Sequence, residues 1–130
     1  MIILDASAAI EWLFQSSTGI KIDRRLFSAS ETLHAPHLLD VEVAQVLRRY
    51  VRDKTVTAQR GEEALADLSD MPLRRYPHDF LLPRVWELRA TLTAYDAVYV
   101  ALAELLDAPL LTCDRRIASA SGHSANVEVV

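Results

Sequence analysis

Short apolar segments alternate along this chain with longer segments that favour helices, and this alternation limits the possible folds more than any other feature. The first segment, Ile2–Leu4, is too short for a helix and ends at an aspartate. The expected strands are residues 2–4, 33–35, 73–76, 110–113 and 127–129. Apolar strands such as the first and the fourth, separated by helices, indicate an α/β fold with a mainly parallel sheet covered on both faces.

The segments between the strands carry helix signals. The expected helices are residues 6–14, 20–28, 38–52, 58–70, 80–91, 94–107 and a short one that begins at Arg115. The clearest is 38–52, where apolar side chains recur at helical spacing from Leu39 to Tyr50. Thr57 is placed to cap the next helix, and the polar residues 15–19 are expected to interrupt the chain between two helices.

The composition predicts one packed domain, residues 1–130. The chain is 51% hydrophobic and 25% charged, with only three Gly and five Pro, which excludes disordered, collagen-like and low-complexity classes. Cys113 is the only cysteine, and a lone thiol is usual in reducing compartments, so we expect a cytoplasmic protein. The apolar start lacks a basic region and contains Asp5 and Glu11, so neither a signal peptide nor a membrane anchor is expected.

The charge of the whole chain does not predict binding to polyanions. Fourteen Lys and Arg against eighteen Asp and Glu give a net charge of −4, which creates no bulk field that attracts nucleic acid. Arg48, Arg49, Arg52 and Lys54 nevertheless lie together. The ordinary explanation of such a run is a solvated helix face, although arginine is the residue better suited to planar phosphate contacts.

Two aspartates follow the most apolar strands. Asp5 comes directly after residues 2–4, and Asp114 comes after residues 110–113. Aspartate is a preferred N-cap, so each residue alone is explained by the start of the next helix. In parallel sheets, however, ligands bind beyond the carboxyl ends of the strands. Both aspartates are therefore also candidates for a functional site.

Two further acids lie near the starts of helices that have an apolar face. Glu42 follows Leu39 by three residues and precedes Val46 by four, and no basic residue on its own helix can pair with it. An acid held against apolar surface without a partner is costly, so we expect a cation to be supplied from elsewhere. Asp96 repeats this pattern, although Thr93 and Asp96 also resemble a capping box with Asp in place of Glu.

Taken together, the four acids predict a metal site. Two acids at strand ends and two near helix starts can converge on one rim of an α/β sheet, and their mutual repulsion there would favour a bound cation. Oxygen-only ligands suit Mg²⁺ or Mn²⁺. Zinc is disfavoured because His34 and His37 have no Cys or acid at zinc-finger spacing and His78 and His123 stand alone, so we expect structural or surface roles for all four histidines. Cys113 is expected to be a core residue rather than a nucleophile.

Four segments carry a family resemblance. MIILDASA, APHLLDVEVAQVLRR, LTAYDAVYVALAE and APLLTCDRRIA, in this order, resemble the motifs of the PIN-domain ribonucleases, and especially the VapC toxins of bacterial type II toxin–antitoxin modules. The similarity runs from end to end. It implies a three-layer α/β/α sandwich whose catalytic residues are Asp5, Glu42, Asp96 and Asp114, with Asp5 and Asp96 as metal ligands and the hydroxyls of Ser7 and Thr112 in support. Asp40 is a further candidate.

The resemblance also implies the chemistry and the partners. The expected activity is Mg²⁺-dependent endoribonuclease cleavage, with Mn²⁺ as a substitute, of structured RNA such as tRNA. The expected partners are a cognate VapB-like antitoxin, which places a basic side chain in the acidic site, and a second copy of the chain in a homodimer.

Other functions on an α/β fold meet obstacles in the sequence. A haloacid-dehalogenase-type phosphatase needs a second aspartate two residues after Asp5, where Ser7 stands. A receiver domain needs a lysine at the end of a later strand, and neither Lys21 nor Lys54 ends one. The remaining alternative is a non-catalytic PIN-like domain that binds RNA or protein; such a domain would tolerate loss of the acids, and all four are present.

Overall fold

The computed structural model describes residues 1–130 and contains one five-stranded sheet in which every neighbouring pair is parallel. The strands are β1 (Ile2–Leu4), β2 (Leu33–Pro36), β3 (Leu73–Tyr76), β4 (Leu110–Thr112) and β5 (Val127–Val129). Their order in the sheet is β3-β2-β1-β4-β5, so β1 is central. Ile2, Ile3 and Leu4 are completely buried, which explains why β1 is apolar at every position.

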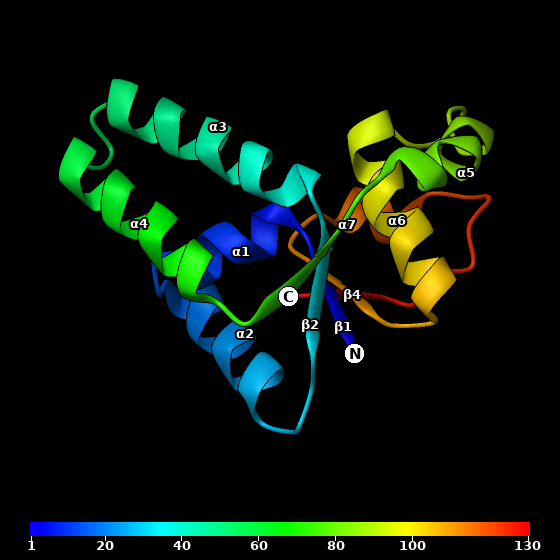
Figure 1. Ribbon diagram of the computed structural model, residues 1–130, viewed down its shortest axis with the longest axis horizontal. Coiled ribbons are helices and arrows are strands. Elements are labelled where there is room, and N and C mark those ends of the chain that lie inside the picture. The colour runs from blue at the N-terminus through cyan, green and yellow to red at the C-terminus, as the bar shows by residue number, and fades with distance from the viewer.

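Helices cover both faces of the sheet (Figure 1). The helices on one side are α1 (Ala6–Leu13), α2 (Ser17–Phe27), α3 (Leu38–Arg52) and α4 (Ala58–Asp70). The helices on the other side are α5 (Leu82–Glu87), α6 (Ala94–Leu106) and α7 (Arg115–Ser119). The α/β/α sandwich is thus confirmed. No helix is both long enough and apolar enough to span a membrane.

The most buried helix is α6, which packs against β1, β2 and β4. Its residues Ala97 to Ala103 are all buried, and small alanines among them allow the helix to lie close to the sheet. This burial on every side agrees with a segment that is apolar almost throughout. The packing brings the start of α6 to the same edge of the sheet as the ends of β1 and β4.

Several sequence-based boundaries are confirmed. Helix α3 spans residues 38–52 and strand β3 spans residues 73–76, as expected. Thr57 caps α4, because its hydroxyl accepts a hydrogen bond from the backbone N–H of Arg60 at 3.1 Å. Cap residues and helical spacing are local signals, and the tertiary structure here does not oppose them.

Two expectations about helices are wrong. Residues 17–19 belong to α2 and are not part of a break: Ser16 caps the helix, and only Gln15 has a left-handed backbone, with φ 48°. Position 19 of α2 has room only for glycine, because a Cβ there would stand 1.9 Å from the carbonyl oxygen of Glu11. Residues 80–91 do not form one helix; a 3₁₀ turn (Asp79–Leu81) leads into the short α5, which ends at Glu87.

Candidate active site

The carboxyl ends of β1 and β4 lie beside each other in the sheet. Strands β2 and β3 extend the sheet on one side of this pair and β5 extends it on the other, so the strand order reverses here. Ligands of parallel α/β folds bind at such a switch point. A cavity of about 320 Å³ opens here. It is lined by Asp5, Ala6, Ser7, Ile10, Glu11, Glu42, Val46, Arg49, Tyr50, Asp96, Tyr99, Cys113 and Asp114.

All four acids proposed from the sequence line this cavity. Asp5 and Asp114 arrive from the ends of β1 and β4, Glu42 from the second turn of α3, and Asp96 from the first turn of α6. Glu11 of α1 is a fifth carboxylate in the lining, which the sequence reasoning missed. Its position six residues after Asp5 carries no recognisable ligand spacing, so only the path of α1 reveals it.

Asp5 is the most buried of these acids, at 4% exposure. Its Oδ1 accepts hydrogen bonds from the hydroxyl of Ser7 at 2.7 Å and from the backbone N–H of Ala8 at 2.9 Å, while Thr112 donates to Oδ2 at 2.5 Å. Burial raises the pKa of the Asp5 carboxyl, and these three donors oppose the rise. Asp5 therefore both caps α1 and presents a fixed carboxylate to the cavity.

Ser7 and Thr112 link the two strand ends. The hydroxyl of Ser7 accepts a hydrogen bond from the backbone N–H of Cys113 at 2.9 Å, and that of Thr112 accepts one from Asp114 at 2.9 Å. Both hydroxyls donate to Asp5, so the carboxylate is oriented from both sides. Cys113 is not within the strand as expected: β4 ends at Thr112, and Cys113 is half-buried in the cavity wall.

Glu42 has a phenol as its partner. The hydroxyl of Tyr99, on α6, donates to Oε1 of Glu42, on α3, at 2.6 Å. Within the chain, the partner of the Glu42 carboxylate is thus a neutral hydroxyl from the opposite helix. Burial raises the pKa of Glu42, the charges of Asp5 and Asp96 raise it further, and the Tyr99 hydroxyl lowers it.

Asp96 is not the cap of its helix. Thr93 caps α6, since its hydroxyl accepts a hydrogen bond from the backbone N–H of Asp96 at 3.2 Å. The carboxylate of Asp96 is left to line the cavity. Burial raises its pKa, the Thr93 hydroxyl opposes this, and the neighbouring charge of Asp114 adds to it.

Asp114 forms an ion pair with Arg116, two residues further along the chain. Arg116 donates through Nε at 3.1 Å to Oδ1 and through Nη2 at 2.8 Å to Oδ2, and its backbone N–H also bonds to Oδ1 at 2.9 Å. This pairing lowers the pKa of Asp114. The arginine reaches back from the first turn of α7, so this contact is local in the sequence.

Asp40 lies outside the cavity. Its carboxylate accepts two hydrogen bonds from Arg75, of 2.7 Å to Nε and 3.0 Å to Nη2, across α3 and β3. Asp40 therefore forms an ion pair with Arg75 and does not line the cavity with the other acids. Its partner comes from a strand that is 35 residues away in the sequence, which spacing alone does not reveal.

The histidines take structural positions. His34 is buried in β2, and its ring nitrogens contact the hydroxyls of Thr32 and Tyr76 at 2.8 and 2.7 Å. His123 contacts the carbonyl oxygen of Ile117 at 3.0 Å. No histidine lines the cavity. This agrees with the absence of zinc-ligand spacing in the sequence.

The donor set fits a hard divalent cation. The polar side-chain atoms that line the cavity are oxygens, except for the guanidinium nitrogens of Arg49 and the sulfur of Cys113. Burial raises the pKa values of Asp5, Glu42 and Asp96. As they are placed, however, no group of three or more His, Cys, Asp or Glu side chains is close enough together to enclose an ion. Mg²⁺ suits such an open site, because it is held by one or two carboxylates and keeps several waters.

Comparisons with known proteins agree with this geometry. The model of the PIN domain family matches residues 2–122. Ribonuclease VapC12 of Mycobacterium tuberculosis is 42% identical over 130 residues, which are 100% of this chain and 99% of the relative. The similarity therefore includes every strand end and helix start that contributes to the cavity.

Solved structures share the fold. The structure of VapC20 of Mycobacterium tuberculosis, described as a sarcin–ricin loop cleaving toxin, has a TM-score of 0.70 at 15% identity and covers 95% of this chain and 97% of its own. A toxin–antitoxin complex from Klebsiella pneumoniae has a TM-score of 0.62 at 20% identity, with 88% and 87% covered. With the full-length sequence similarity, these findings show that the chain belongs to the PIN domain family, among the VapC ribonucleases.

Proposed function

We propose that this protein is a metal-dependent endoribonuclease and the toxin of a toxin–antitoxin pair. One observation carries the proposal: the carboxylates of Asp5, Glu42, Asp96 and Asp114, from four separate elements, line one cavity at the switch point of the sheet. Carboxylates brought together in this way, with raised pKa values on three of them, repel one another unless a cation joins them. Family membership supports RNA as the substrate class.

The metal is Mg²⁺, with Mn²⁺ as a substitute. Asp5 and Asp96 are its direct ligands in this proposal, and Glu42 and Asp114 complete the site or orient water. When bound, such an ion lowers the pKa of its water and offsets the negative charge of the attacked phosphate. In-line hydrolysis would leave a 5′-phosphate and a 3′-hydroxyl.

The chain's own residues prepare the site for this ion. Ser7 and Thr112 hold the carboxylate of Asp5 from both sides, which fixes the direction of its free lone pairs. Tyr99 holds Glu42 in the same way from the opposite wall. Arg116 keeps Asp114 ionised, and this carboxylate must part from the guanidinium to take part in the site.

The substrate is structured RNA, and we expect tRNA. Exposed bases in loops are the readable part of RNA, and a strand in a loop can bend into an open cavity, whereas a duplex presents a regular backbone. A relative of the same fold is described as cleaving the sarcin–ricin loop, which is also a looped RNA.

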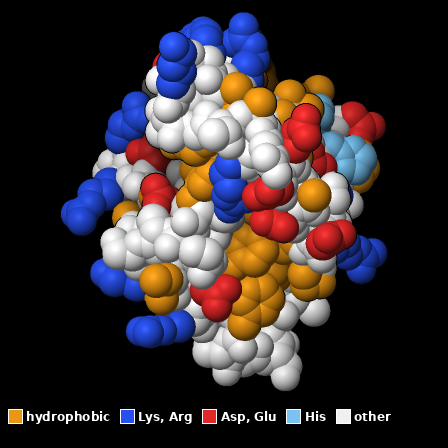
Figure 2. All heavy atoms as spheres, turned by 90° about the vertical axis from the view of Figure 1, so that its left-hand side faces the viewer, with side chains coloured by type: hydrophobic (Ala, Val, Ile, Leu, Met, Phe, Trp, Pro, Cys, Tyr) orange, Lys and Arg blue, Asp and Glu red, His pale blue; other side chains and the backbone are white.

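The inhibitor is a cognate antitoxin that places a basic side chain in the acidic cavity, and the toxin forms a homodimer. Five carboxylates in the lining favour a cationic ligand when RNA is absent. Acidic side chains also gather on the face shown in Figure 2, around a hydrophobic area below its centre, whereas Lys and Arg lie mainly along its left and upper edges. An antitoxin as the partner is consistent with the toxin–antitoxin complex from Klebsiella pneumoniae, which shares the fold.

A cleavage assay with matched variants tests the proposal. Purified protein is incubated with a tRNA mixture in Mg²⁺, in Mn²⁺ and in EDTA, and Asp5→Asn is compared with Asp40→Asn. Asp40 is the control because it is an aspartate paired with Arg75 outside the cavity. We expect EDTA and Asp5→Asn to abolish cleavage and Asp40→Asn to preserve it.

Two results would contradict the proposal in different ways. Cleavage that persists after exhaustive chelation and dialysis refutes the metal mechanism. Tight RNA binding without cleavage in either metal supports the non-catalytic alternative. Co-expression with the product of the neighbouring open reading frame tests the antitoxin: failure to co-purify, together with harmless expression of the isolated protein in its host, refutes the toxin assignment.

A further inference from the structure

Arg49 is the only basic residue that lines the acidic cavity. It stands on α3, seven residues after Glu42, so that the two side chains share one side of the helix two turns apart. At 1.5 Å per residue the separation along the helix axis is about 10 Å. Arg49 therefore lies at the rim of the site, on the wall that also carries Glu42.

The guanidinium of Arg49 has no carboxylate partner. Other arginines form ion pairs within the chain: Arg25, Arg52, Arg60, Arg75, Arg84 and Arg116. The only recorded contact of the Arg49 side chain is with an aromatic ring, since its Cζ lies 5.9 Å from the centre of the Tyr50 ring. Tyr50 in turn packs against Phe14, with the ring centres 5.9 Å apart. The side chain thus rests on a supported ring while its five donors stay free.

An anionic strand needs a cation at this place. RNA must approach a cavity lined by five carboxylates on a chain whose net charge is −4. A metal ion can offset this repulsion only at the phosphate that it contacts. A planar guanidinium at the rim can form two hydrogen bonds with the next phosphate along the strand.

We propose that Arg49 binds a backbone phosphate of the RNA adjacent to the one that is cleaved, and so positions the strand across the acidic cavity. This inference rests on the proposed ribonuclease function. In this arrangement Arg49 contributes mainly to substrate binding, because the phosphate that it holds does not change its charge in the reaction.

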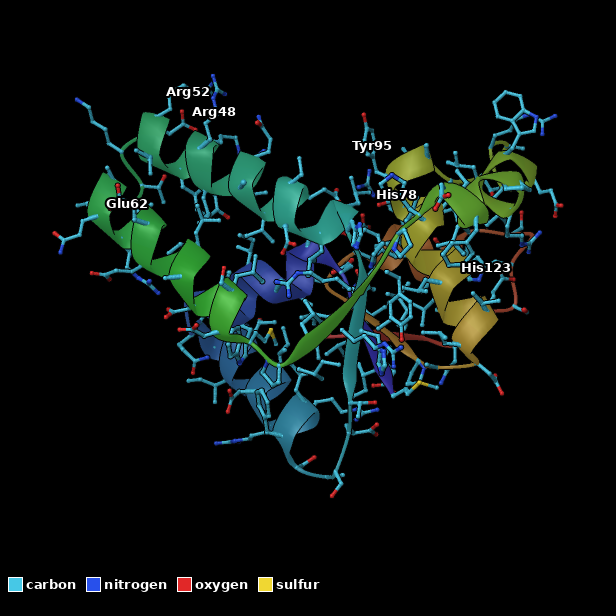
Figure 3. All side chains as sticks on the ribbon, viewed as in Figure 1. Arg48, Arg52, Glu62, His78, Tyr95 and His123 are labelled. Atoms are coloured by element: carbon cyan, nitrogen blue, oxygen red, sulfur yellow. The ribbon has the colours of Figure 1, made fainter.

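Arg48 is a matched control on the same helix. It is exposed like its neighbour, but it borders a different groove, between α3 and α4, together with Arg52 and Glu62. Figure 3 shows Arg48 and Arg52 at the far end of α3, well away from the strands. A variant of Arg48 removes the same charge from the chain without removing a group from the cavity.

The experiment compares Arg49→Gln, Arg49→Lys and Arg48→Gln. The probe is a fluorescein-labelled synthetic RNA hairpin with a mixed-sequence loop; binding is measured by fluorescence anisotropy in EDTA at several KCl concentrations, and cleavage in Mn²⁺ gives kcat and KM. We expect Arg49→Gln to weaken binding roughly tenfold and to raise KM similarly, with a smaller effect on kcat. The slope of log Kd against log salt should become shallower by about 0.7, the value for one phosphate contact to single-stranded nucleic acid.

The other variants make the result specific. Arg49→Lys should keep most of the salt dependence and recover part of the affinity, because the charge remains but the two-pronged geometry is lost. Arg48→Gln should change affinity less than about twofold. Thermal melts of all three variants check that the fold is intact.

Each result separates this inference from the proposed function. If Arg49→Gln and Arg48→Gln give the same KM and the same salt slope while the wild type cleaves, the role of Arg49 is refuted and the ribonuclease function stands. A loss of kcat at unchanged KM and salt slope also refutes it. If the wild type neither binds nor cleaves this hairpin or the tRNA mixture, the proposed function fails, and this inference fails with it.

Discussion

The hydroxyl of Tyr99 and the carboxylate of Glu42 join α6 to α3 across the candidate active site, with 2.6 Å between the two oxygens. The two residues come from opposite faces of the sheet, because α3 and α6 belong to different helical layers. This hydrogen bond sets the position of Glu42 and limits the rise of its pKa. The position and the pKa of Glu42 therefore depend on how the two helical layers pack together.

Tyr99→Phe should shift the acid side of the pH–activity profile to higher pH. Burial already raises the pKa of Glu42, and removal of the donor raises it further, so the carboxylate stays protonated, and unable to serve a cation, up to a higher pH. The lost hydrogen bond should also cost about 1 kcal/mol of unfolding free energy. Cleavage rates against pH, and urea unfolding, measure the two effects.

Tyr95→Phe is the control for this prediction. Tyr95 lies on the same helix but is 63% exposed, and no hydrogen bond of its hydroxyl is recorded. Its variant should leave both the pH profile and the stability unchanged. Equal profiles for Tyr99→Phe and Tyr95→Phe would show that Glu42 does not titrate as a functional group.

Asp96→Asn should abolish cleavage and leave the stability of the metal-free protein equal or higher. Thr93, and not Asp96, supplies the cap of α6, so the substitution removes a repelled charge and no capping oxygen. Thr93→Ala is the counterpart and should destabilise the protein by about 1 kcal/mol through the lost cap. Thermal melts with and without Mn²⁺, beside the cleavage assay, measure both.

An Asp96→Asn variant that still cleaves RNA and is still stabilised by Mn²⁺ would mean that Asp96 is no metal ligand. A large loss of stability without metal would instead mean that its carboxylate supports the fold. Neither result is compatible with the site proposed here.

Arg116→Gln should strengthen Mn²⁺ binding. The guanidinium holds both carboxylate oxygens of Asp114 and therefore competes with a metal for them. Its side chain is 88% exposed, so the effect should be modest, about two- to fivefold in affinity. Calorimetric titration with Mn²⁺ measures it, with the neighbouring Arg115→Gln as the control for a change in net charge; equal affinities of the two variants would contradict the competition.

Glu104→Gln should lower stability at neutral pH but not at strongly acidic pH. Arg84 donates to both carboxylate oxygens at 2.9 Å, and with Ser124 it lowers the pKa of Glu104 from 4.5 to about 2. This depressed pKa stabilises the fold above pH 4.5, and the stabilisation disappears as the pH falls toward 2.

The expected difference at neutral pH is about 1 to 2 kcal/mol, because the pair is partly screened by solvent. Urea unfolding across this pH range checks it. Glu87→Gln is the control, since Glu87 also pairs with Arg84 but is 64% exposed and should contribute little. A difference between wild type and Glu104→Gln that stays constant down to pH 2 would contradict the assignment.

The sequence by itself determined the alternation of strands and helices, the cap at Thr57 and the four acids that line the cavity. These features are local: apolar runs, helical spacing and cap residues act over a few residues, and the order of motifs identifies the family. The expected break at residues 15–19 was wrong, because local polarity did not show that Gly19 packs against the carbonyl of Glu11. The expected single helix at 80–91 was wrong because a 3₁₀ turn at Asp79–Leu81 precedes a helix that spans only Leu82–Glu87.

Only the tertiary structure decided what surrounds each acid. Glu42 meets Tyr99, 57 residues further along the chain, and Asp5 meets Thr112, 107 residues further along. Such partners depend on which helix covers which face and on the register of neighbouring strands, neither of which spacing in one segment encodes. The same packing decides which side chains of α3 reach the cavity. Asp40 lies on another side of the helix from Glu42 and pairs with Arg75, whereas Arg49, two turns after Glu42, shares its side and lines the cavity.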